Sequence, residues 1–123
     1  MTSDDFVRLI RDTVYAVAVK DVETLLASPP GRRPPPSLIE LSQWHEGLSG
    51  EDRQRVHMTT QLAARAAVFG FFAVLDGVTS IRDAGETGGL IELRYIENGE
   101  SVLLNAPTGA LLHDLFAAAV PMA

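Results

Sequence analysis

The chain contains no cysteine among its 123 residues. A disulfide framework, a thiolate nucleophile and a zinc–thiolate site are therefore excluded. The first residues, MTSDDF, are acidic and lack a basic segment followed by an apolar one, which argues against a secretory signal. We expect a cytoplasmic protein.

Basic residues are also scarce. Ten Lys and Arg stand against sixteen Asp and Glu, a net charge of −6. This balance argues against binding nucleic acid or an anionic membrane, because such binding depends on neutralising phosphates. From Asp76 onward seven acids face only Arg82 and Arg94. Two interpretations fit this acidic C-terminal part: a face for a basic partner, or an ordinary solvated surface.

No apolar run is long enough to cross a bilayer. The longest stretch without a polar side chain, Ala66 to Leu75, holds ten residues and lies between Arg65 and Asp76. A transmembrane helix needs about 20 apolar residues. The sequence therefore predicts no membrane span, and the stretch is interpreted as part of a helix.

The length indicates a single domain over 1–123, and its first element is predicted to be a helix over 4–27. Ser3 is its expected N-cap, and a break is expected near Lys20. A Pro/Arg-rich loop follows over 29–37, because proline ends a helix. The residues expected on the apolar face of this helix are Phe6, Ile10, Thr13, Val14 and Val17.

Two further helices are predicted, a short one over 38–48 and a long one from about Gly50 to Leu75. Ser49 is the expected cap of the long helix, and Asp76-Gly77 its stop. A polar stripe of Arg53, His57, Gln61 and Arg65 ends where Phe69 and Phe72 begin. A helix that is apolar all round must be covered all round. We therefore expect this end to lie in the core, between the N-terminal helix and a hairpin.

The final third of the chain changes from helical to strand periodicity. Asn98-Gly99 predicts a type I′ hairpin turn, with Tyr95 opposite Val102 and Leu93 opposite Leu104. Residues Val78 to Asp83 are a candidate third strand. A C-terminal helix is expected after a cap at Asn105 or Thr108. The predicted class is α+β, with N-terminal helices including one long central helix packed on a small antiparallel sheet of two or three strands, then a C-terminal helix.

The segments VFGFFAVLDGV, ELRY and LLHDLF resemble a group of small uncharacterised bacterial single-domain proteins, over about Val68 to Phe116. The resemblance rests on apolar residues rather than reactive ones, and it implies no activity. The bias of nine arginines to one lysine fits a GC-rich bacterial source.

No motif for catalysis, metal or cofactor binding is present in the sequence. His45, His57 and His113 lack the i, i+4 spacing of a helical metal site, so no catalytic residue, metal or cofactor is predicted. Trp44, the single tryptophan, is expected to anchor the core or to be a binding hot spot. The residues proposed as ligand- or partner-binding candidates are Trp44, His57, Arg65, Phe69, Phe72 and Tyr95.

Two hypotheses about function follow. The first is a non-catalytic protein-interaction domain, either a homodimer or an immunity-type neutraliser of a basic toxin, whose association an acidic face would speed. The alternative is a small enzyme or ligand-binding domain with an aromatic-lined pocket and a His/Arg polar group.

Overall fold

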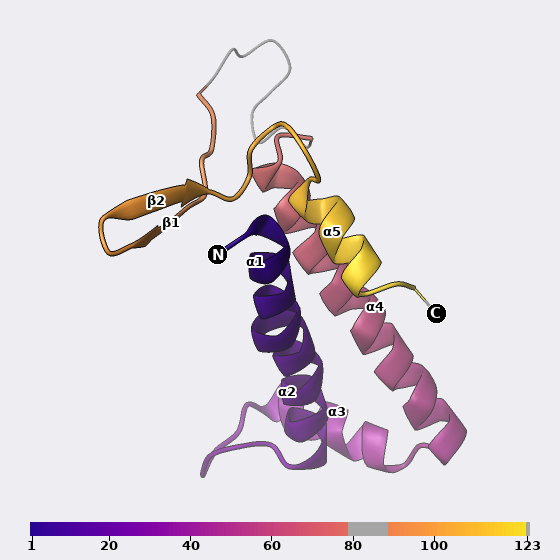
Figure 1. Ribbon diagram of the computed structural model, residues 1–123. Coiled ribbons are helices and arrows are strands. Elements are labelled where there is room, and N and C mark those ends of the chain that lie inside the picture. Colours follow the sequence, from indigo (N-terminus) through magenta and orange to yellow (C-terminus); the bar gives the residue numbers. More distant parts are fainter. Residues whose placement is uncertain (79–88, 123) are drawn as a thin grey trace.

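The computed structural model describes residues 1–78 and 89–122. Within them helices come first, a two-stranded antiparallel hairpin follows, and a helix comes last (Figure 1). The predicted α+β class is confirmed.

The N-terminal helices form one continuous rod. It consists of α1 (Ser3–Ile10), a π-helical turn η1 (Arg11–Tyr15) and α2 (Ala16–Ala27). The break expected near Lys20 is absent, since α2 runs through it. The N-cap is Thr2 rather than Ser3: its hydroxyl accepts the Asp5 amide, and the Asp5 carboxylate accepts the Thr2 amide in return. This reciprocal pair is a capping box.

The π-helical turn explains why the predicted apolar face is only partly right. The Ala16 amide donates to the Arg11 carbonyl, so this turn contains one residue more than an α-helical turn. The extra residue moves the inner face by one position, and Tyr15 and Val19 point inward. Val14 and Val17, which were expected inside, are exposed.

The helix α3 (Pro36–Glu46) begins two residues earlier than predicted. Pro36 occupies its first position, where a missing amide proton costs nothing, so the Pro-rich loop ends at Pro35. The side chain of Ser42 is buried against the N-terminal rod and donates to the Leu26 carbonyl at 2.5 Å. The helix is thereby fixed to the end of α2.

The long helix α4 (Gly50–Leu75) has the predicted bounds. The Ser49 hydroxyl accepts the Asp52 amide at 3.1 Å, as expected for its cap. Asp76 follows the last turn, and Gly77 has φ 76°, the left-handed conformation that glycine adopts without strain. Both predicted ends of α4 are confirmed.

The hairpin has the predicted turn and register. Strands β1 (Arg94–Glu97) and β2 (Glu100–Leu103) pair Tyr95 with Val102, and the Leu104 amide donates to the Leu93 carbonyl. Asn98 and Gly99 both have positive φ, as a type I′ turn requires. The predicted third strand lies outside the described residues, apart from Val78.

The C-terminal helix α5 (Leu112–Ala119) is not capped by Asn105 or Thr108. Instead the Asp76 carboxylate accepts the amides of Leu112 and His113 at 3.1 and 2.8 Å. Asn105 has a different role: its amide group donates to the Leu75 and Ile91 carbonyls, and its oxygen accepts the Leu93 amide. It therefore joins the end of α4 to the base of the hairpin.

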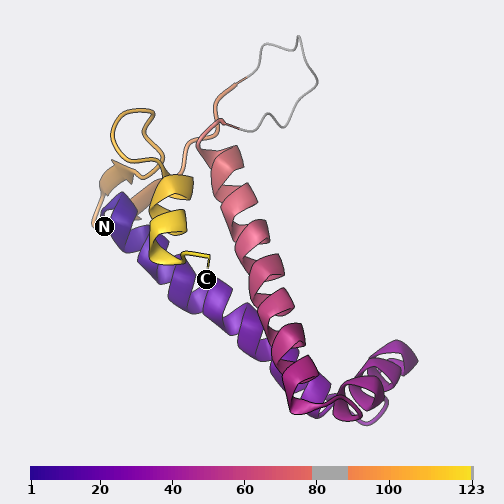
Figure 2. The ribbon, with the colours of Figure 1, turned by 90° about the vertical axis from the view of Figure 1, so that its right-hand side faces the viewer.

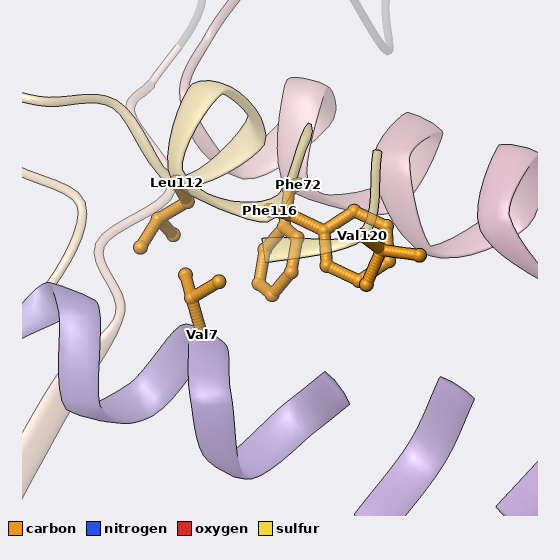
Figure 3. Close-up of a cluster of buried hydrophobic side chains, with 5 residues drawn as sticks. All are labelled: Val7, Phe72, Leu112, Phe116 and Val120. Carbon is orange, nitrogen blue, oxygen red and sulfur yellow. The ribbon is translucent and has the colours of Figure 1, made fainter. Parts of the chain in front are cut away.

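The central core is built around α5, which lies between α1 and α4 (Figure 2). Its buried members come from α1, α4 and α5 and from the residue that follows α5, and they point toward one another (Figure 3). They are Val7, Phe72, Leu112, Phe116 and Val120. The position beside α4 that the sequence assigned to the hairpin is thus taken by α5, and the hairpin projects from the helices (Figure 1).

Candidate interaction surface

The two faces of α4 differ sharply in burial. Phe72 is 1% exposed in the core, whereas its neighbour Phe71 is 63% exposed. Phe69 is half-buried, and its ring meets the His113 ring edge-on at 5.4 Å. Phe69 and Phe72 therefore belong to the fold, as the sequence favoured. The exposed aromatic residue of α4 is Phe71.

Phe71 is one of a set of exposed residues that run along α4 between Met58 and Phe71. We call this set the outer face of α4. Small residues fill its centre, and Thr59 is its only polar member. Leu62 and Phe71 lie at its opposite edges, because they are two and a half helical turns apart. It consists of Met58, Thr59, Leu62, Ala63, Ala66, Ala67, Gly70 and Phe71.

No charge lies on this outer face, because the one charged residue between Met58 and Leu75 turns inward. Arg65 donates from Nε to the Val120 carbonyl at 2.6 Å, and its guanidinium lies 5.9 Å from the centre of the Phe69 ring. Arg65 thus ties α4 to the end of α5. The second half of α4 is apolar all round, as predicted, but no other described element covers its outer face.

The apolar character of α4 extends over a length that could cross a membrane. Of the helices in residues 1–78 and 89–122, this is the one that passes that test of length and composition. Core helices of soluble proteins pass the same test, but most of their apolar residues are buried. Here only 11% of the apolar window is buried. The helix therefore differs from an ordinary core helix.

The total exposed surface is also large. The chain exposes 8620 Å². A compact folded monomer of 123 residues is expected to expose about 6,500 Å². The difference is about 2,100 Å² on the same scaling, and the hairpin that projects from the helices contributes to it (Figure 1). Other large apolar side chains contribute to it, among them Leu9 on α1 and Leu41 on α3, both about half exposed.

One polar residue of the predicted site, His57, lies toward the other end of α4 beside Arg53, whereas Arg65 lies beside Phe69. Arg53 donates to the carbonyls of His45 and Glu46, and His57 pairs with Glu23 of α2. Together these side chains border a cavity of about 400 Å³ between α2, α3 and α4. Within the described residues no three His, Asp or Glu side chains converge as metal ligands.

The aromatic residues expected to line that pocket are not brought to it. Phe69 and Phe72 lie in the core around α5, and Tyr95 is on the hairpin. The Tyr95 hydroxyl donates to Glu97, and this hydrogen bond raises the pKa of Tyr95. Trp44 is 53% exposed on α3, so the prediction that it anchors the core is wrong. The aromatic-lined pocket with His57 or Arg65 is therefore not assembled.

Among the described residues, the acids of the C-terminal part have different environments. The side chain of Asp76 is fully buried, where it accepts amides at the start of α5 and contacts the His113 ring of the same helix. Glu92 pairs with Arg94, and Glu97 accepts the Tyr95 hydroxyl. Asp83 and Glu86 lie outside the described residues. Binding of a basic toxin stays a prediction.

Sequence reasoning missed two features, the exposure of Phe71 and the Asp76–His113 pair. The spacing of Thr59, Ala63, Ala67 and Phe71, which places no charge on one side of the helix, was the available signal for the first. Nothing local in the sequence signals the second, because the paired residues are 37 positions apart.

Comparison with known proteins adds no relative to this picture: no family model, no curated protein and no solved structure matches the chain. The resemblance to small bacterial proteins stays a prediction.

Proposed function

We propose that this protein is a non-catalytic protein-interaction domain that binds a partner through the outer face of α4. The observation that carries the proposal is the exposure of Phe71, Leu62 and Met58 around an uncharged outer face of α4, with Leu62 and Phe71 at its opposite edges. Covering each of these half-exposed side chains would contribute roughly 1 kcal/mol. An apolar strip of this length is typical of a binding surface rather than of a solvated one.

Protein is favoured over lipid as the material that covers this face. The turn η1 packs against α4 and carries Arg11 and Asp12, which are paired with each other and exposed. A bilayer around α4 would also enclose this turn, and each charge in hydrocarbon costs about 2.5–3.5 kcal/mol or more. A protein partner can cover the outer face and leave η1 in water.

The test is photocrosslinking from the outer face. We would replace Phe71 with p-benzoylphenylalanine, which keeps an aromatic ring at that position, and irradiate cells that produce the protein. A matched variant carries the probe at Glu40, an exposed polar position on α3. The expected result is a covalent protein adduct from position 71 and none from position 40.

Two results would contradict the proposal. Adducts confined to lipid would assign α4 to a membrane. If the probe at position 71 formed no adduct with protein or lipid and reacted only with water, as a free probe does, the outer face would be exposed to solvent.

A further inference from the structure

The cavity between α2, α3 and α4 combines an aliphatic lining with a small set of polar groups. Its volume of about 400 Å³ lies within the usual range of small-molecule sites, about 300–1,000 Å³. Val22, Leu26 and Val56 supply the aliphatic lining, and the polar lining includes Arg53 and His57. None of the lining residues belongs to the outer face of α4, so the cavity is separate from the surface of the proposed function.

Arg53 is held in a fixed orientation by the end of α3. Its Nε and Nη2 atoms donate to the carbonyls of His45 and Glu46 at 3.3 and 2.6 Å. These carbonyls form the negative end of the α3 dipole, and their bonds to Arg53 offset the repulsion that they would exert on an anion. The remaining nitrogen, Nη1, donates to no acceptor within residues 1–78 and 89–122. One side of a positioned guanidinium is therefore available to a ligand.

Arg53 also lacks a carboxylate partner in the described part of the chain. Arg55, two residues further along α4, pairs with Glu51 and Asp52, both at 2.7 Å. The acid that borders the cavity, Glu23, is paired with His57 instead. A guanidinium matches the planar geometry of a carboxylate and binds it by charge-assisted hydrogen bonds. Arg53 is thus suited to a carboxylate that comes from outside the protein.

We infer that this cavity binds a small monocarboxylate with an aliphatic chain. The carboxylate lies on Arg53, and the chain lies against Val22, Leu26 and Val56. A single negative charge is favoured over a phosphate, because one guanidinium is available and the Glu23 carboxylate would repel a second charge. Burial of the aliphatic chain against apolar side chains supplies the rest of the affinity.

An NMR titration tests the site on the natural chain. Hexanoate is expected to shift the backbone amides of residues 22–26 and 53–57 in a saturable way, with a dissociation constant of about 1 mM or lower. Hexanamide has the same chain without the charge, and acetate has the charge without the chain. Each is expected to bind at least about 10-fold more weakly than hexanoate. Equal binding of hexanoate and either of these two compounds would overturn the inference.

A pair of arginine variants tests the role of Arg53. Arg53→Gln is expected to weaken hexanoate binding about 10-fold or more, because charge-assisted hydrogen bonds are lost. Arg55→Gln is the matched control, since it removes the same charge two positions away and should leave the affinity unchanged. Equal weakening in both variants would trace the effect to net charge and would overturn the site. If Arg53→Gln loosens α3, the comparison of hexanoate with hexanamide on the natural chain still decides.

The position of the shifted amides separates this site from the outer face. Shifts confined to residues 62–71 would place hexanoate on the outer face and overturn the inference, as would tighter binding of inorganic phosphate than of hexanoate. No saturable shift well above the expected dissociation constant would overturn it as well. The proposed function would be untouched by these results, because it depends on the adducts formed at position 71.

Discussion

A single carboxylate serves two helices in this protein. Asp76 ends α4, and its side chain accepts two of the free amides at the start of α5 while it contacts His113 Nδ1 at 2.6 Å. The side chain is completely buried, so water cannot replace these bonds. The position of α5 in the core therefore depends on this residue.

Replacing Asp76 by Ala is expected to lower the free energy of unfolding by about 2–4 kcal/mol, because two amides and a histidine lose their partner. Urea denaturation followed by circular dichroism measures the loss. Asp114→Ala is the matched control: this neighbour of His113 is 69% exposed, and we expect a change within about 0.5 kcal/mol. Equal losses in the two variants would contradict the assigned role of Asp76.

The capping box at the N-terminus makes the first turn of α1 sensitive to pH. The Thr2 amide donates to the Asp5 carboxylate, and this bond lowers the pKa of Asp5. A carboxyl whose pKa is lowered by folding stabilises the fold above its unfolded pKa of about 3.9. That stabilisation is lost as the pH falls through the lower, folded value.

We therefore expect the protection of the Asp5 and Phe6 amides against hydrogen exchange to decrease as the pH falls through the lowered pKa of Asp5. In the Asp5→Asn variant the same amides should be less protected above this pH and should show no such step. A step that persists in that variant would assign the transition to another acid.

At the scale of the elements, the π-helical turn decides which side chains reach the core. The turn η1 contains one extra residue, and Thr13 is exposed within it. Deleting Thr13 is therefore expected to convert the turn to α-helix and to leave Val19 and Leu26 buried. The free energy of unfolding should then change by less than about 1 kcal/mol.

Deleting Ala18 from the regular helix α2 is the control. It turns Val19 and Leu26, both buried, by about 100° toward water, and we expect a loss of about 3–6 kcal/mol. Thermal denaturation compares the two deletions. A larger loss from the deletion of Thr13 would show that η1 is not a simple insertion.

Elements set by neighbouring residues could be predicted from the sequence, and those set by distant contacts could not. Ser49 and Gly77 mark the ends of α4, and Asn98-Gly99 fixes the hairpin register, because each acts within a few residues. The π-helical turn and the cap of α5 depend on contacts between separate helices. The same limit applies to the site: the absence of charge beside Phe71 is readable in the sequence, but its exposure follows from where α5 packs.

At the scale of the whole molecule, an uncharged interface should respond to salt differently from an acidic one. Salt screens attraction between opposite charges, whereas sulfate strengthens the burial of apolar surface. If a partner covers the uncharged outer face, sodium sulfate should leave the dissociation constant of that complex unchanged or lower it. Sedimentation at increasing sulfate concentration measures this, and a steady weakening would instead indicate pairing of charges across the interface.

The cap of α5 by a distant carboxylate also has a consequence for the order of folding. Leu111 makes no side-chain bond to the first turn of α5, so that turn lacks a local partner until α4 has ended and brought Asp76 into place. We expect α5 to dock after the folding transition state. In stopped-flow measurements Asp76→Ala should then accelerate unfolding and leave the folding rate nearly unchanged, because interactions formed late affect mainly the unfolding rate.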